Sequence, residues 1–164
     1  MIKINIQEID HMDVIATDEA LKLAIDQYWE TVPIVWNQIR SHLRSIAMEQ
    51  FDISVGQFYV LRHIRKGLTS VRDIADARQI SRPAISQEVD LLVEKGLITR
   101  KQEADDRRFV HLALTNEGEV LLNQLFALNR AWMEERMAQL SADDLNQITQ
   151  GLKLIKSAFD SIVA

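Results

Sequence analysis

The 164 residues include 47% hydrophobic and 26% charged side chains, a balance typical of soluble globular proteins and unlike that of disordered chains. The chain has no cysteine, which excludes disulfides, thiolate metal sites and cysteine-based redox sensing. No apolar run reaches the ~18 residues that a membrane span needs, and residues 1–13 lack the pattern of a signal peptide. We therefore expect a cytoplasmic protein that does not enter the membrane.

The net charge of −5 argues at first against a nucleic-acid partner, but the charges are unevenly distributed. Between Arg62 and His111 the chain has eleven Lys and Arg against eight Asp and Glu, whereas the remainder has eight against sixteen. A mildly basic segment in an acidic chain is compatible with a local DNA-binding surface. A solvated mixture of charges would also produce it, so the asymmetry carries little weight alone.

The first 50 residues divide into an arm and a helix. Residues 1–17 alternate isoleucine with polar residues at Ile2, Ile4 and Ile6, which predicts a short strand or an extended arm. Residues 18–50 then follow a helical period, with apolar positions at steps of three and four: Leu21, Ile25, Tyr28, Val32, Val35, Ile39, Leu43 and Ile46. Pro33 interrupts this pattern and predicts a kink or a break near Thr31.

The pattern of residues 51–115 predicts a DNA-binding domain of the winged helix-turn-helix class. Ser54 and Gln57 form a capping box that opens a helix ended by Gly67. Ser70 caps a short helix to about Ala77 and Ser81 caps another to about Lys95, so only residues 78–80 separate them. A turn of that length fits a helix-turn-helix.

The second of these helices has two different faces. Ile85, Val89 and Leu92 form its apolar stripe. The opposite face holds polar residues near its N-terminus: Arg82, Pro83, Ser86, Gln87 and Asp90. Arg pairs with guanine and Gln with adenine in the major groove, and a helix N-terminus favours a phosphate. An ordinary solvated helix surface is the alternative explanation.

Two β-type runs follow, at residues 97–102 and 109–114, and they predict a hairpin. The polar loop between them carries Arg107 and Arg108, which could enter a minor groove because its negative potential attracts arginine. Asp105 or Asp106 would pair with one of these arginines and hold the loop in shape. The fold class is therefore mainly α with a small β-hairpin, a winged helix-turn-helix with a helical dimerisation region.

Residues 116–164 predict two further helices. Thr115 or Asn116 caps the first, and Ser141 caps the second. The last helix repeats apolar residues at alternating steps of three and four: Leu145, Ile148, Leu152, Ile155, Phe159 and Ile162. This spacing is that of a heptad seam, which packs on a partner helix. Packing into the protein's own core remains the alternative.

Together these segments resemble the MarR (multiple antibiotic resistance regulator) family. The resemblance rests on Ser81–Ser86, on Val93–Ile98, and on Asp105–Arg108 followed by Leu114–Gly118. It implies a homodimer that binds double-stranded DNA at a pseudo-palindromic operator and releases it when a small, often aromatic or phenolic ligand binds. The residues then expected to bind DNA are Ser70, Ser81, Arg82, Pro83, Ser86, Gln87, Asp106, Arg107 and Arg108.

The same resemblance places the remaining candidate sites. A ligand would bind near Trp36, His42, Phe58, Tyr59 and His63. The dimer interface would use Leu21, Ile25, Leu145, Ile148, Leu152, Ile155 and Phe159. Four histidines without cysteine make a zinc site improbable, so we expect no metal and no cofactor. The sequence contains no recognisable spacing of a nucleophile and a base, which argues against an enzyme. The competing hypothesis is a winged helix whose surface binds another protein.

Overall fold

The structure is a computed structural model that describes residues 6–102 and 110–160. It consists of six helices and a two-stranded antiparallel hairpin among these residues, which confirms the predicted fold class. The elements are α1 (Ile6–Phe51), α2 (Val55–Arg65), α3 (Val71–Arg78), α4 (Arg82–Glu94), β1 (Ile98–Gln102), β2 (Val110–Leu114), α5 (Asn116–Met137) and α6 (Ala142–Asp160). The chain divides into two compact units, residues 1–122 and 123–164.

Helix α1 is one continuous element, and it corrects the prediction for the N-terminal arm. Residues 6–17 are helical and not a strand or an extended segment. Only Ile6 of the three alternating isoleucines lies within the described helix, and so short a pattern does not distinguish a strand from a helix. Pro33 lies inside α1 without breaking it: proline removes a single backbone hydrogen bond, and the turns on either side continue the helix.

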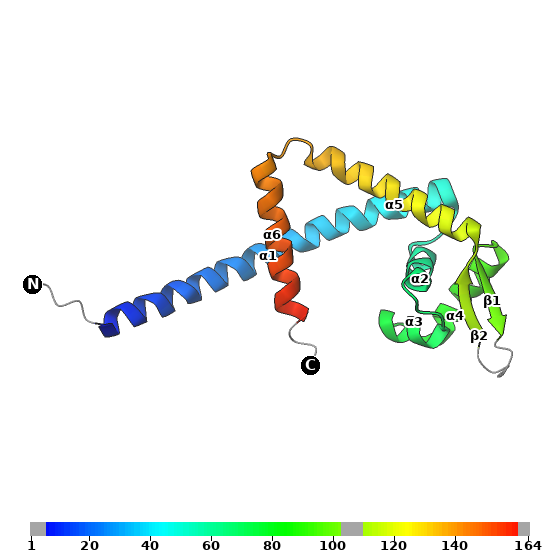
Figure 1. The fold of residues 1–164 in the computed structure, drawn as a ribbon, viewed down its shortest axis with the longest axis horizontal. Coiled ribbons are helices and arrows are strands. Elements are labelled where there is room, and N and C mark those ends of the chain that lie inside the picture. Colours follow the sequence, from blue (N-terminus) through cyan, green and yellow to red (C-terminus); the bar gives the residue numbers. More distant parts are fainter. Residues whose placement is uncertain (1–5, 103–109, 161–164) are drawn as a thin grey trace, which may run out of the picture. The chain divides into compact units, whose positions relative to one another are not determined.

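Helix α2 begins at the predicted capping box. Ser54 Oγ accepts from the backbone N of Gln57 at 3.0 Å, and the Ser54 backbone N donates to Gln57 Oε1 at 3.0 Å. The helix buries Phe58, Leu61 and Ile64, the side chains that the helical period placed on its inner face. Figure 1 shows α2, α3, α4 and the hairpin gathered around one end of α1. We refer to residues 51–115 as the winged head.

The three helices of the head end in the same way. Each is followed by a residue in the left-handed conformation: Gly67 (φ 93°), Gln79 (φ 54°) and Gly96 (φ 70°). In each case the next backbone N–H donates back to a carbonyl in the last turn, as Ile80 does to Ala75 at 3.1 Å. This motif satisfies carbonyls that a helix end leaves open. Glycine adopts it without strain, whereas Gln79 does so at some cost.

Strands β1 and β2 pair in register from Ile98 with Leu114 to Gln102 with Val110. The second edge of β2 is held by the head, because the Leu112 backbone N donates to the carbonyl of Thr69 at 2.7 Å. Thr69 Oγ1 also lies 3.0 Å from His111 Nδ1. The hairpin is therefore fastened to the segment that leads into α3. The loop at its tip, residues 103–109, lies outside the described residues.

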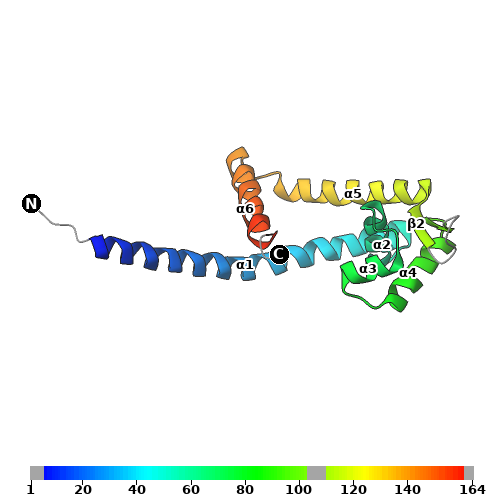
Figure 2. The ribbon, with the colours of Figure 1, turned by 60° about the horizontal axis from the view of Figure 1, so that its bottom comes forward.

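Helices α5 and α6 complete the chain. Thr115 Oγ1 accepts from the Gly118 backbone N at 3.0 Å, so Thr115 and not Asn116 caps α5. Ser141 caps α6 as predicted, accepting from the Asp144 backbone N at 3.2 Å. Figure 2 shows both helices from a second direction. None of the helices built from described residues is long and apolar enough to cross a membrane.

Candidate nucleic-acid interface

Helix α4 has one apolar face packed into the core of the head and one polar face exposed to solvent. Ile85, Val89 and Leu92 are buried in the head. Arg82, Pro83 and Gln87 are exposed, and Ser86 is half-buried. Arg82 makes no ion pair with any described residue, so its guanidinium is available for an external acceptor. Ser81 occupies the N-cap position, but its side chain makes no cap hydrogen bond.

One residue that the sequence placed on this face has a partner in the chain. Asp90 Oδ1 accepts from Arg100 Nη2 of β1 at 2.5 Å. This ion pair links the helix to the hairpin. Arg100 was not among the predicted site residues, because ten residues and a helix end separate it from Asp90. The hairpin register places the exposed Lys101 next to Arg100, opposite His111.

Polar contacts hold α4 in place from behind. Lys95 Nζ donates to Asp52 Oδ2 at 2.5 Å, just after the end of α1. Glu88 Oε2 accepts from Ser54 Oγ at 3.4 Å, at the start of α2. Arg78, at the end of α3, donates to the carbonyl of Gly56 at 3.3 Å. The contacts of Lys95 and Glu88 thus help to orient α4 together with its apolar stripe, whereas the contact of Arg78 joins α3 to α2.

The start of α3 supplies a second group of polar residues. Ser70 Oγ accepts from the Asp73 backbone N at 3.0 Å, so this predicted DNA contact also serves as a helix cap. Arg72 is exposed in the first turn, with its Nε 3.7 Å from Asp76 Oδ2. An exposed pair of that kind contributes little stability, so Arg72 can exchange its carboxylate for a phosphate at small cost. Arg72 was not among the residues predicted from the sequence, because it belongs to no recognised motif.

The wing residues Asp106, Arg107 and Arg108 lie outside the described residues. The structure does place the strands from which their loop begins and ends, since Gln102 pairs with Val110. The contribution of these three residues to DNA binding stays a prediction.

The predicted ligand residues lie on α1 and α2. Phe58 is buried and contacts Tyr59 edge to face, with ring centroids 5.3 Å apart. The guanidinium of Arg78 lies 5.4 Å from the Tyr59 ring centroid. Trp36 is exposed, and His42 is half-buried. These positions bring three of the aromatic side chains to neighbouring turns of α2.

His63, one helical turn after Tyr59, has an unusual environment. Its pKa is lowered first by burial and then by the positive charges of Arg78, Arg62 and Lys66. The ring is therefore neutral at pH 7. A neutral imidazole beside three cations favours an anionic neighbour more than a cationic one.

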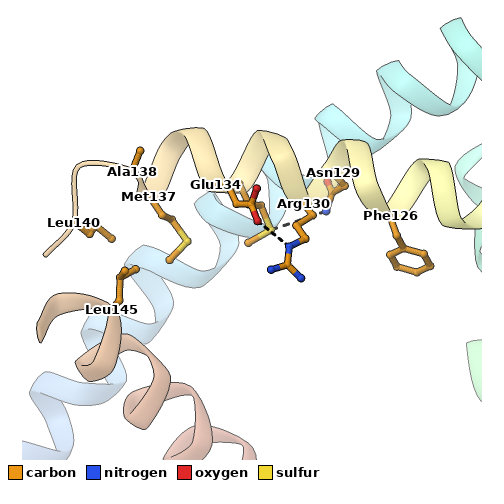
Figure 3. Close-up of a pocket in the computed structure, with 9 residues that line it drawn as sticks. Phe126, Asn129, Arg130, Glu134, Met137, Ala138, Leu140 and Leu145 are labelled. Carbon is orange, nitrogen blue, oxygen red and sulfur yellow. Dashed lines mark hydrogen bonds and ion pairs between the residues drawn. The ribbon is translucent and has the colours of Figure 1, made fainter. Parts of the chain in front are cut away.

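A groove of about 690 Å³ lies in the second unit, between the end of α5 and the start of α6 (Figure 3). Its apolar lining comes from Phe126, Met133, Met137 and Leu145, among other residues. Arg130 and Glu134 form an ion pair at 2.8 Å within it. The Asn129 Oδ1 atom is buried there without a hydrogen-bond partner among the described residues. None of the five predicted ligand residues lines this groove.

The residues predicted for the dimer interface are exposed in the single chain. On α1 these are Leu21 and Ile25, and the neighbouring Trp29 and Val32 continue the same face. On α6 they are Leu145, Ile148, Leu152, Ile155 and Phe159, and α6 has no buried side chain. Trp29 was missed by the sequence prediction although it lies one turn after Ile25 on the same stripe.

No group of three or more His, Asp or Glu side chains comes together as a metal site anywhere in the part of the chain that the structure describes. The histidines of the described region that were weighed as zinc ligands lie on α1, α2 and β2.

Residues 51–108 match the family model described as "MarR family", which covers most of the winged head. Two curated proteins of Bacillus subtilis (strain 168) are similar to the chain. The transcriptional repressor MdtR is 29% identical over 62% of this chain and 66% of its own length. The transcriptional regulator MhqR is 27% identical over 85% of this chain and 92% of its own length. The match to MdtR thus spans slightly less than two thirds of that protein.

Solved structures show the same fold. A MarR family protein from Bacillus stearothermophilus superposes with a TM-score of 0.75 at 14% identity, over 85% of this chain and 97% of that one. The curated relatives are transcriptional regulators and not enzymes, in agreement with the expectation from the sequence. The family match over residues 51–108, the relatives and the exposed polar face of a helix-turn-helix together make this chain similar to the MarR family of transcriptional regulators.

Proposed function

We propose that the chain is a homodimeric, cytoplasmic repressor that binds a pseudo-palindromic operator and leaves it when a small aromatic or phenolic ligand binds. The observation that carries DNA binding is helix α4. It keeps Arg82, Pro83 and Gln87 exposed while the polar contacts of Glu88 and Lys95 and a buried stripe fix its position. A helix fixed in this way can enter a major groove without losing much conformational entropy.

The test is fluorescence anisotropy of the purified protein with its own upstream intergenic DNA and with a shuffled duplex, at several salt concentrations. Sequence-preferring binding with a steep salt dependence is expected, because each phosphate contact releases counterions. Arg82→Ala should weaken operator binding by about 1–3 kcal/mol. Lys22→Ala removes the same charge from α1 and should leave the affinity nearly unchanged. Equal, weak binding to both duplexes would contradict the proposal.

The wing is tested in the same assay. Replacing Arg107 or Arg108 by alanine should each weaken binding by about 1–3 kcal/mol if the side chain reaches DNA. Unchanged affinity for both variants would remove the wing from the reading surface while leaving α4 in place.

Dimerisation is supported by apolar side chains that the single chain does not cover. The seam on α6 and the stripe on α1 are exposed, and the groove beside α5 contains the unpartnered Asn129 Oδ1. Buried polar atoms in native proteins nearly always have a partner. A second copy of the chain would supply both the apolar cover and a donor. Sedimentation of the purified protein should therefore show a dimer.

Ligand release is supported by the aromatic residues of α1 and α2. Tyr59 and the neutral His63 lie beside the cationic Arg78, a combination that suits an aromatic acid. Quenching of tryptophan fluorescence across a panel of aromatic acids tests this placement, because Trp36 is one of the proposed residues. A compound that releases DNA without any quenching would place the ligand elsewhere.

A further inference from the structure

The first turn of α5 lies directly against the turn that follows α4. The Thr115 backbone N donates to the carbonyl of Leu97 at 3.1 Å. Thr115 Oγ1 donates to the carbonyl of Gly96 at 2.7 Å and accepts from the Gly118 backbone N at 3.0 Å. One hydroxyl therefore links the residues just after α4 to the beginning of α5.

Gly118 leaves no space for a side chain at this contact. A Cβ atom there would lie 2.1 Å from the Leu97 carbonyl oxygen and 3.1 Å from its carbon. Both are backbone atoms that cannot turn aside, so a methyl group would force the two segments apart by about 1 Å to reach ordinary contact. Gly151 in α6 is different, because a Cβ added there meets nothing within 4 Å.

We propose that Gly96, Leu97, Thr115 and Gly118 form a rigid joint that fixes α4 relative to α5 and so sets the spacing of the two reading helices in the dimer. Helix α5 continues from this joint into the second unit, whose last helix carries the exposed seam. Because α5 is a single helix, a displacement at the joint changes where α4 lies relative to the axis of α5. The inference rests on the proposed function, because spacing has meaning only for a dimer on two half-sites.

Thr115 and Gly118 are positioning residues in this assignment, since they act through α4. Half-sites of a two-fold operator are about 34–36 Å apart, one helical turn of DNA. A change of about 1 Å per subunit in the position of α4 then alters the fit to both half-sites at once. A residue needed only for folding would instead lower the affinity for every DNA by the same factor.

The experiment measures binding to a duplex of about 30 base pairs that the unaltered protein selects from a random library, and to versions with one base pair inserted or removed at its centre. The variants are Gly118→Ala with Gly151→Ala as control, and Thr115→Ala with Thr115→Ser as control. The unaltered protein and both controls should prefer the selected spacing. Gly118→Ala should bind that duplex about tenfold more weakly and should lose or shift the spacing preference.

Thermal unfolding followed by circular dichroism establishes that each variant is folded. Loss of affinity by the same factor on all three duplexes would overturn the joint as a spacing device, and so would an unchanged profile. If Gly118→Ala does not fold, Thr115→Ala decides between the same outcomes, because it removes the hydroxyl without adding bulk. An unaltered protein that shows no spacing preference would instead refute the two-half-site mode of the proposed function.

Discussion

The winged head and helix α6 use their apolar side chains in opposite ways. In the head, α2, α3 and α4 each bury an apolar face against other residues of the same chain. In α6, the side chains of the heptad spacing are exposed, with Leu152 at 63% and Phe159 at 59%. Both patterns have helical spacing, so spacing alone does not tell whether a stripe faces its own core or another molecule.

The comparison separates two sources of stability. The head has what an independently folding domain needs: a buried core, capped helices and a hairpin tied to the segment before α3. Helix α6 exposes a row of large apolar residues, which soluble proteins seldom leave uncovered. We expect substitutions in the head to change the free energy of unfolding, and substitutions in the seam to change the free energy of association.

The largest effect should come from the core of the head. Leu92→Ala removes a side chain with 0% exposure and should lower the free energy of unfolding by about 2–5 kcal/mol, because a cavity remains. The adjacent Leu91, 39% exposed, is the matched control, and Leu91→Ala should cost much less. Urea denaturation measures both variants. An equal decrease in the free energy of unfolding for the two variants would contradict the placement of Leu92 in the core and of Leu91 at the surface.

The second effect should appear in association. Ile155→Asp places a charge within the α6 seam and should weaken the dimer by about 3 kcal/mol or more, because an unpaired charge is expensive to bury. Leu154→Asp is the control, since Leu154 is 72% exposed and lies off the seam. Sedimentation over a concentration series reports the dissociation constants. An intact dimer with Ile155→Asp would mean that this seam is not the interface.

Two serine caps allow a closer comparison of the units. Ser54 and Ser141 each exchange side-chain hydrogen bonds with the third residue of their helices. Ser54 is half-buried and also contacts Glu88, whereas Ser141 is exposed. Ser54→Ala should therefore cost about 1–2 kcal/mol and Ser141→Ala about 0.5–1 kcal/mol in thermal unfolding. The reverse order would show that the second unit depends more on its local caps than the head does.

The smallest effect concerns pH. The folded head holds the pKa of His63 below its ordinary value, through burial and then the charges of Arg78, Arg62 and Lys66. The unfolded chain takes up this proton first, so stability is fully present above about pH 6.5 and falls as the pH drops toward the folded pKa. His63→Gln should reduce that acid sensitivity of the unfolding midpoint. A midpoint that depends on pH equally in both proteins would exclude His63 as its source.

Much of the head could be predicted from the sequence, because its signals are local. Serines before apolar runs, glycines after them and the stripe of Ile85, Val89 and Leu92 each depend on a few neighbouring residues. The helix starts at Ser54 and Ser70 and the presence of the hairpin followed from such signals, whereas its register did not. The family resemblance through residues 81–118 then connected these elements to DNA.

Other features could not be predicted, because they depend on residues distant in the chain. The Asp90–Arg100 pair and the close approach of Gly118 to Leu97 follow from the packing of α4 against the hairpin and α5. The prediction of a strand or an extended arm failed over residues 6–17 for a different reason, since three isoleucines are too few to tell a strand from a helix.

The hairpin has one further consequence, for solubility. Strand β2 has partners on both edges, β1 and Thr69, whereas β1 pairs only with β2 within the described residues. An open strand edge can recruit strands of other molecules and start aggregation. Here the exposed Lys101 lies on that strand beside Arg100, whose charge is paired with Asp90. We expect the exposed charge of Lys101 to oppose pairing of the hairpins of neighbouring molecules into a larger sheet.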